Sequence, residues 1–164
     1  MFSAIFLIFN AVTLYERVQS DRNRVTQALT LALQAATAQG AIAAGRQVTW
    51  DAPVAQTAAV QAVDAFLPVQ LAALAAHGAQ YSPTTAAPPD WTGLVTLGSF
   101  QTSNTGGTAS LFGQSQSVPG PFVAATVSIP VTERFLGVPL SFTLEVGRVM
   151  QVYGYNGQQF TEYP

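Results

Sequence analysis

The sequence predicts an α+β fold: one long N-terminal α-helix, apolar and then amphipathic, followed by short helices and a small antiparallel β-sheet. Three observations support this. Residues 1–39 contain no proline or glycine, so nothing interrupts a helix before Gly40. Apolar residues recur at helical spacing after Asp51. Apolar and polar residues alternate in 123–131 and 140–146, as is typical of strands.

The N-terminal segment Met1–Tyr15 carries no charge. As a helix it would be about 22 Å long, shorter than the ~30 Å hydrocarbon core of a membrane. Helix-forming residues continue beyond it, so we predict a single helix from about Met1 to about Gln39. Its first half is apolar on all sides, and such a helix must be buried in lipid or in protein. The side chains that need this cover are Phe2, Ile5, Phe6, Ile8, Phe9, Val12 and Leu14.

A second helix is predicted to begin after Asp51, a suitable N-cap, with Pro53 in its first turn. Pro68 is expected to kink or restart it, and residues 69–77 are expected to continue as helix up to a stop at Gly78. The chain is thus expected to divide into a spine helix at 1–45, short helices packed on the spine at 46–78, and a β-rich head at 79–164.

The head is predicted to contain two weak strands, at 94–101 and 109–113, and two stronger strands joined by the link ERFLGVP. Gly147 suggests a bulge before the last strand resumes. The residues expected to face inward are Val123, Ala125, Val127, Ile129 and Val131 on one strand, and Leu140, Phe142, Leu144 and Val146 on the next. Thr126 and Ser128 are expected on the opposite face.

Residues that carry enzyme chemistry are sparse, and we expect no enzyme activity and no catalytic, metal or cofactor site. The chain has no cysteine, and its single histidine, His77, is expected at a helix end where a cation complements the helix dipole. The eight acidic residues are scattered, and an acid–base pair such as Asp51 with Asp90 could form only through folding. A net charge of −2 without a basic stripe gives no reason to expect nucleic-acid binding.

One group of charges lies in the middle of the predicted long helix. Arg17 and Asp21 are four residues apart, and Asp21 and Arg24 are three apart, so pairs worth roughly 0.2–0.5 kcal/mol each are available within the helix. The group is expected to form a solvated collar where the helix leaves a membrane, or matched charges between neighbouring copies in a polymer, and the first arrangement could precede the second. Its members are Glu16, Arg17, Asp21, Arg22 and Arg24.

The overall composition is poor in charge. Charged residues make up 9% of the chain and none is lysine, against about 25% in typical soluble proteins. Such a composition suits a chain that buries much of its surface against copies of itself, because a solvated monomer needs more charge to stay dispersed. A membrane-anchored domain with a coding bias against lysine would look the same, so both interpretations stay open.

The order of the elements resembles the lollipop plan of type IV pilins and pseudopilins, in which an apolar segment leads into a long amphipathic helix and a small β-rich domain. The segments RVTQALTLALQAATAQG and VAATVSIPVTERFLGVPLSFTLEVGRVMQVYG are more narrowly similar to TadE/TadG-type pilin-like proteins of tight-adherence systems. Mature type IV pilins usually have Glu at position 5, where this chain has Ile5. The pairing of that Glu with the N-terminus is therefore not transferred.

The resemblance implies a precursor held in the cytoplasmic membrane and cut by a prepilin peptidase, which would make Met1 the processed N-terminus. It also implies that an assembly ATPase packs the helices into the core of a homopolymeric, extracellular filament on the cell surface, with a role such as cell adhesion. Two alternatives stay open. One is a membrane-anchored minor pseudopilin or accessory of a Tad or type II-like secretion machine, and the other is an anchored hydrolase or ligand-binding domain.

Overall fold

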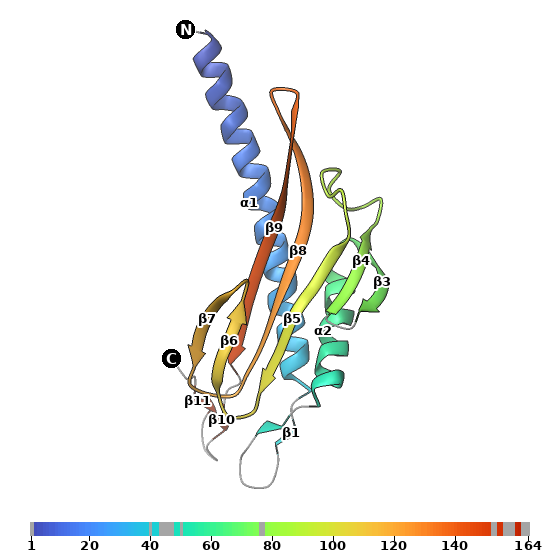
Figure 1. Ribbon diagram of the computed structural model, residues 1–164, viewed down its shortest axis with the longest axis vertical. Coiled ribbons are helices and arrows are strands. Elements are labelled where there is room, and N and C mark those ends of the chain that lie inside the picture. The colour runs from blue at the N-terminus through green and yellow to red at the C-terminus, as the bar shows by residue number, and fades with distance from the viewer. Residues whose placement is uncertain are drawn as a thin grey trace.

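The computed structural model describes residues 2–39, 41–42, 48–49, 51–75, 78–151, 154–155 and 160–161. Its fold is α+β, with one long helix running along one face of an antiparallel sheet and a shorter helix beside it (Figure 1). The helices are α1 (Phe2–Thr37) and α2 (Ala52–Phe66). The strands are β1 (Ala41–Ile42), β2 (Val48–Thr49), β3 (Val69–Ala75), β4 (Gly78–Pro83), β5 (Val95–Ser103), β6 (Gly107–Leu111), β7 (Gln114–Val118), β8 (Phe122–Phe135), β9 (Val138–Gln151), β10 (Gly154–Tyr155) and β11 (Phe160–Thr161).

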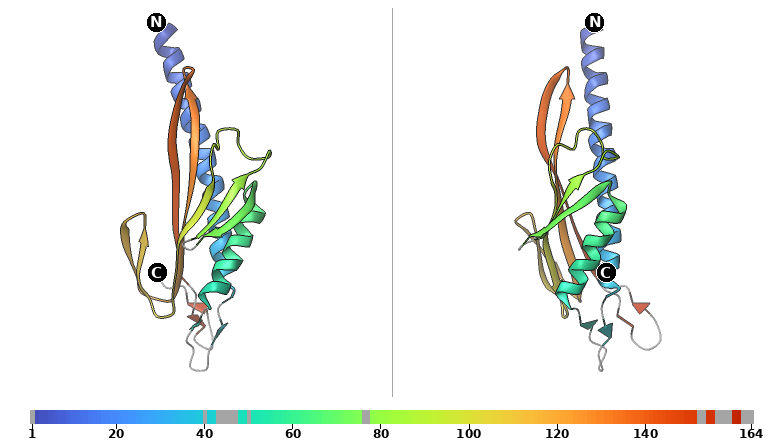
Figure 2. Two further views of the ribbon diagram at one scale, coloured as in Figure 1. Left: turned by 45° about the vertical axis from the view of Figure 1, so that its right-hand side comes forward. Right: turned by 90° about the vertical axis from the view of Figure 1, so that its right-hand side faces the viewer.

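The long N-terminal helix is confirmed as the single element α1. Its buried side chains all lie in its second half, where it packs on α2 and on the sheet. The first half extends beyond α2 towards the N-terminus (Figure 2). The buried residues of α1 are Val25, Ala28, Leu29, Ala32, Leu33 and Ala36. The two halves therefore have different roles, and only the second contributes to the core.

The start of α2 is also as predicted. Asp51 has an extended backbone, and its side chain accepts a hydrogen bond from the backbone N–H of Val54 at 3.4 Å. Small side chains such as Ala55 and Ala59 are fully buried in the core that α2 shares with α1. The hydroxyl of Tyr81, on β4, donates to the carbonyl of Val60 at 3.0 Å and so connects the sheet to α2. Burial raises the pKa of this tyrosine.

Residues 69–75 form the strand β3, so the predicted continuation of the helix is wrong. Helix α2 ends because Leu67 precedes a proline and has the extended backbone that such residues prefer. Strand β3 then pairs with β4, from Val69 opposite Pro83 to Ala75 opposite Gly78. These pairings override the helix propensity of an alanine-rich segment, which is a weak preference. His77, which was expected at a helix end, lies outside the described residues.

The main sheet has the strand order β3-β4-β5-β8-β9, with all neighbours antiparallel. The predicted strands at 94–101 and 109–113 are present as β5 and β6, whereas β7 was not predicted. Strands β8 and β9 are paired without interruption from Phe122 to Phe135. Gly147 lies opposite Thr126 within this pairing, so the predicted bulge there is wrong.

The inward face predicted for β8 is confirmed, because the five residues named for it are at most 3% exposed. On β9 the prediction is correct for Leu144 and Val146 only. Leu140 and Phe142 lie on the same face but are exposed, because they belong to the part of the hairpin that extends beyond the core. A second, small core on the opposite face joins the β6–β7 hairpin to the sheet, through Ala109, Val118, Phe122 and Ala124.

Candidate assembly surface

The apolar side chains predicted for the first half of α1 are largely exposed. Phe9 and Ile8 are 70% and 65% exposed, although burying a side chain of this size contributes about 1.5–3 kcal/mol. Met1 lies outside the described residues, and for Phe2 only the backbone is described. Of the other predicted residues, Ile5, Phe6 and Val12 are exposed and Leu14 is half-buried. No helix in the described part of the chain combines the length and apolar character needed to cross a membrane.

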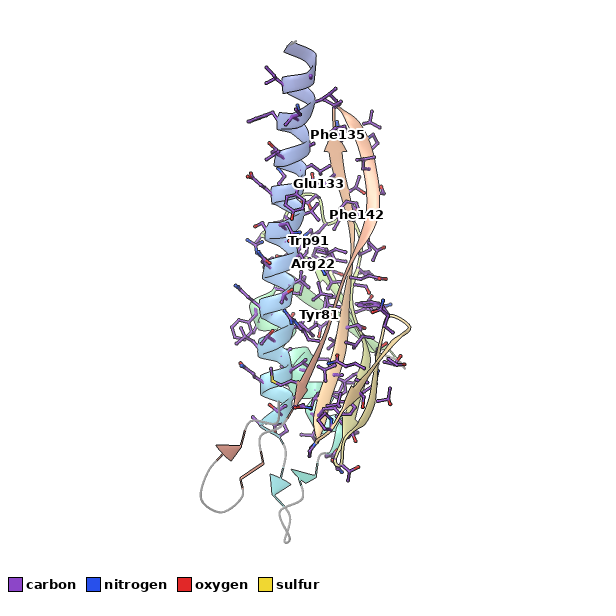
Figure 3. All side chains as sticks on the ribbon, turned by 90° about the vertical axis from the view of Figure 1, so that its left-hand side faces the viewer. Arg22, Tyr81, Trp91, Glu133, Phe135 and Phe142 are labelled. Carbon is purple, nitrogen blue, oxygen red and sulfur yellow. The ribbon has the colours of Figure 1, made fainter. Side chains whose placement is uncertain are left out.

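The β8–β9 hairpin adds exposed apolar side chains that the sequence did not locate. The hairpin rises alongside the first half of α1, and Phe135 and Phe142 lie on it (Figure 3). Its turn is the pair Leu136 and Gly137, both with positive φ, which is the geometry of a two-residue hairpin.

We call the exposed apolar residues of both elements the assembly surface. It comprises Ile5, Phe6, Leu7, Ile8, Phe9, Val12 and Tyr15 of α1, together with Leu136, Val138, Leu140 and Phe142 of the hairpin.

The charges in the middle of α1 interact with the sheet more than with one another. Arg17 Nη1 lies 3.7 Å from Glu133 Oε2 on β8, and this is the single ion pair among the described residues. The Glu133 side chain is 6% exposed and that of Arg17 is 65% exposed, so the pair lies at the edge of the packed region. The predicted ion pairs of Asp21 with Arg17 and Arg24 are not formed. Glu16, Arg22 and Arg24 are exposed.

Asp21 contacts the segment that precedes β5. The indole Nε1 of Trp91 donates a hydrogen bond to Asp21 Oδ2 at 3.1 Å, and Trp91 itself is buried (Figure 3). The pKa of Asp21 is raised, mainly by burial and also by the neighbouring carboxyl of Asp90. The Trp91 hydrogen bond and the charge of Arg24 act in the opposite direction and lower it. Asp90 Oδ2 is buried without a hydrogen-bond partner in the described structure. The carboxyl group that acts on Asp21 is thus that of Asp90, whereas Asp51 caps α2.

Replacing Asp21 by Asn is expected to stabilise the fold near pH 7. The amide oxygen can still accept from Trp91, and the amide nitrogen can donate to Asp90 Oδ2, which is worth about 1 kcal/mol in the free energy of unfolding. An aspartate with a raised pKa binds its proton more tightly in the folded chain than in the unfolded chain. The charged form of Asp21 therefore lowers the free energy of unfolding above this pKa, and this cost disappears as the pH falls through the pKa. The gain in stability from Asn should decrease over the same pH range.

Thermal unfolding at pH 7 and at acidic pH measures this effect. Glu16→Gln is the matched control, because it removes one negative charge from the exposed side of the same helix. An equal gain from both substitutions, or a gain for Asp21→Asn that does not change with pH, would contradict the role of the Asp21–Asp90 pair.

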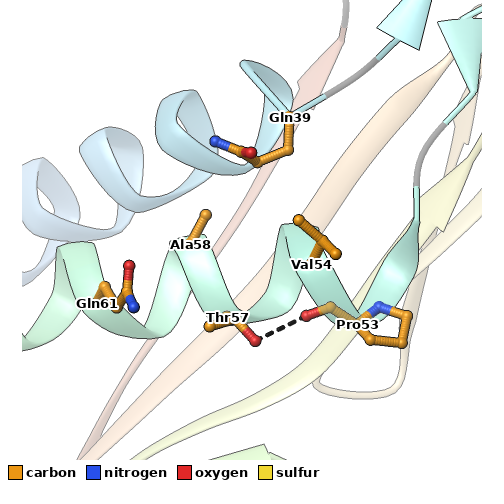
Figure 4. Close-up of a pocket in the computed structure, with 6 residues that line it drawn as sticks. All are labelled: Gln39, Pro53, Val54, Thr57, Ala58 and Gln61. Carbon is orange, nitrogen blue, oxygen red and sulfur yellow. Dashed lines mark hydrogen bonds between the residues drawn. The ribbon is translucent and has the colours of Figure 1, made fainter.

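A pocket lies where the end of α1 meets the start of α2 (Figure 4). It has a volume of about 310 Å³, and the Thr57 hydroxyl beside it donates to the carbonyl of Pro53 at 2.8 Å. The residues lining it are Gln39, Pro53, Val54, Thr57, Ala58 and Gln61. None of these side chains is a titratable acid or base, so the pocket offers no group for acid–base chemistry.

Among the residues that the structure places, no three metal-ligating side chains come together. Comparison of the chain with protein-family models, curated proteins and solved structures found no match.

Proposed function

We propose that this chain is a structural subunit of an extracellular, pilus-like filament, in which the N-terminal helices of neighbouring copies pack together in the fibre core. The observation that carries the proposal is the exposure of the first half of α1, from Ile5 to Val12. One face of the second half is already buried against α2 and the sheet, so the first half presents most of the exposed apolar surface of α1 to another molecule.

Energetics favour contacts through this segment. Each large apolar side chain that becomes buried between copies contributes about 1.5–3 kcal/mol, and the first half of α1 presents several of them in succession. Contacts between exposed charges are worth only about 0–1 kcal/mol each. The helix would therefore supply most of the assembly free energy, and other surfaces would set register and specificity.

The charges that follow the apolar segment suit a role in register. Glu16 is exposed and makes no ion pair in the described part of the chain, and the same is true of Arg22 and Arg24. Copies that are staggered along the fibre could therefore pair Glu16 of one with an arginine of the next. By resemblance to pilins, the other partners would be the cytoplasmic membrane before assembly, a prepilin peptidase and an assembly ATPase.

Negative-stain microscopy of material sheared from cells, with mass spectrometry of the intact subunit, tests the proposal. Filaments composed mainly of this chain are expected. If the chain is found only in the membrane fraction and no filament contains it, the role of a membrane-anchored pseudopilin or accessory replaces that of a fibre subunit.

A further inference from the structure

A groove of about 630 Å³ lies on the sheet around Thr126, whose side chain points away from α1. Thr126 stands between two glycines in one cross-strand row, opposite Gly98 on β5 and Gly147 on β9. A Cβ on Gly98 would lie 3.4 Å from Thr126 Oγ1, so the missing side chain leaves space directly beside this hydroxyl. The residues lining the groove are Gln56, Gly98, Ser99, Phe100, Phe112, Thr126, Ser128 and Glu145.

The second glycine of this row brings the β6–β7 hairpin close to the sheet. A Cβ on Gly147 would lie 3.2 Å from Leu111 Cβ and 3.4 Å from the Phe112 ring, so a larger residue would push the hairpin away. Figure 2 shows this hairpin on the side of the sheet opposite α1. Phe112, in the hairpin turn, consequently forms one wall of the groove.

Two walls of the groove have an unfavourable backbone. Ser99 has φ 47 at the irregularity in β5, and Phe112 has φ 50 in the hairpin turn. Positive φ is uncommon for residues other than glycine, and for a bulky residue it is an outlier. Of the three such residues in the described structure, these two line the same groove. Phe112 and Gly113 form a two-residue hairpin turn like Leu136 and Gly137, whereas Ser99 has its positive φ inside a strand. Strained backbone such as that of Ser99 tends to occur at binding and catalytic sites.

The side chain of Gln101 connects Ser99 to the β6–β7 hairpin, two residues before Phe112. Its Nε2 donates to the carbonyl of Ser110 at 2.6 Å and to that of Ser99 at 3.3 Å, and its Oε1 accepts from the N–H of Ser110 at 3.0 Å. One amide thus connects the β5 irregularity to the β6–β7 hairpin, which keeps the groove formed before any ligand arrives.

The groove combines unused polar groups with aromatic rings. Thr126 is 4% exposed, and its hydroxyl has no hydrogen-bond partner in the part of the chain that the structure describes. Ser128 and Glu145 lie opposite each other on β8 and β9, and they add a hydroxyl and a carboxylate. Phe100 and Phe112 supply apolar surface. A few polar groups among aromatic walls, in a volume of about 300–1,000 Å³, is the usual composition of a small-ligand site.

These groups favour one chemical class of ligand. Hydroxyl, amide and carboxylate groups match a ligand that carries several hydroxyls, and aromatic rings match a ligand with an apolar C–H face. Glu145 would repel an anion, and no basic side chain lines the groove to offset it. We propose that the groove binds one uncharged sugar ring, either free or within a polysaccharide. This inference does not depend on the proposed filament, because none of the lining residues belongs to the assembly surface.

Saturation-transfer NMR on the full chain, with methyl glucoside, methyl galactoside and N-acetylglucosamine as probes, tests binding. A signal from at least one of them is expected. Cello- and chito-oligosaccharides form a second arm, and tighter binding of an oligomer than of its single ring identifies a polysaccharide as the source. If no probe and no oligomer gives a signal, the proposal is wrong.

Phe112→Asn separates a binding role from a structural one. Asn tolerates positive φ, so the variant should have a higher Tm, yet the loss of the ring should weaken sugar binding about tenfold or more. Leu136→Asn is the matched control, since Leu136 has φ 53 in the β8–β9 turn and lies away from the groove. It should raise Tm without changing sugar affinity. Unchanged affinity in Phe112→Asn, or an equal loss in Leu136→Asn, would overturn the assignment.

Thr126→Val gives an independent measure of the role of this hydroxyl. The change removes a hydroxyl that has no hydrogen-bond partner in the described structure, so the Tm should not fall, while sugar affinity should drop about tenfold. A variant with full affinity would show that the ligand does not reach the floor of the groove, which contradicts the proposal.

Discussion

A full-length chain carrying Phe9→Asp is expected to form no filaments while keeping the circular-dichroism spectrum and Tm of the parent. Phe9 is 70% exposed in the single copy, so the change should alter the free energy of unfolding by no more than about 0.5 kcal/mol. In a fibre core the carboxylate would be removed from water without a partner, at a cost of several kcal/mol for each subunit added. Sedimentation and negative-stain microscopy at matched concentration measure the loss of assembly.

Gln27→Glu is the matched control for this variant. Gln27 is exposed on the second half of the same helix, so the substitution introduces the same charge away from the assembly surface. The control should assemble normally. Filaments of normal diameter from Phe9→Asp would contradict the packing of the first half of α1 in the fibre core.

Replacing Val127 by Asp is expected to unfold the sheet and the helices packed on it. Val127 is fully buried in the middle of β8, between the sheet and the helices. An unpaired carboxylate there costs several kcal/mol, which is a large part of the 5–15 kcal/mol that stabilises a typical domain. Loss of the near-ultraviolet circular-dichroism signal at 25 °C should report the unfolding.

Val138→Asp is the corresponding control on the same hairpin. Val138 is 59% exposed, so a carboxylate at this position stays in water and stability should change little. A stable, folded Val127→Asp chain would show that the inner and outer faces of β8 are reversed. That outcome would also place Thr126 in the core and remove the basis of the groove.

The elements that the sequence predicted well are those whose pattern is local. The absence of proline and glycine before Gly40, the Asp51 cap and the alternation along 123–131 each act within a few residues, and each led to the correct element. Strand β3 failed because its alanine-rich sequence favours helix, whereas its conformation is decided by pairing with β4, which follows it in the chain.

The candidate sites differ in the same way. The exposed half of α1 could be predicted because a helix that is apolar all round needs external cover. The exposure of Leu140 and Phe142 could not, since alternation shows which face a side chain takes and not where the core ends. The groove at Thr126 depends on the strand register, which places a glycine of β5 on one side of Thr126 and a glycine of β9 on the other. Such a register cannot be predicted from a single sequence.

The division of α1 into a free half and a buried half has a mechanical consequence. If the free half is held in a fibre and the sheet is pulled, the load passes down the helix axis into the interface around Leu29 and Leu33. Because β8 and β9 run alongside α1 over this interface, the pull acts along the contacts and shears many of them at once. Because these contacts would break together, they share the applied force. The subunit should therefore resist a pull along the axis of α1 far better than a pull that separates α1 from the sheet one contact at a time.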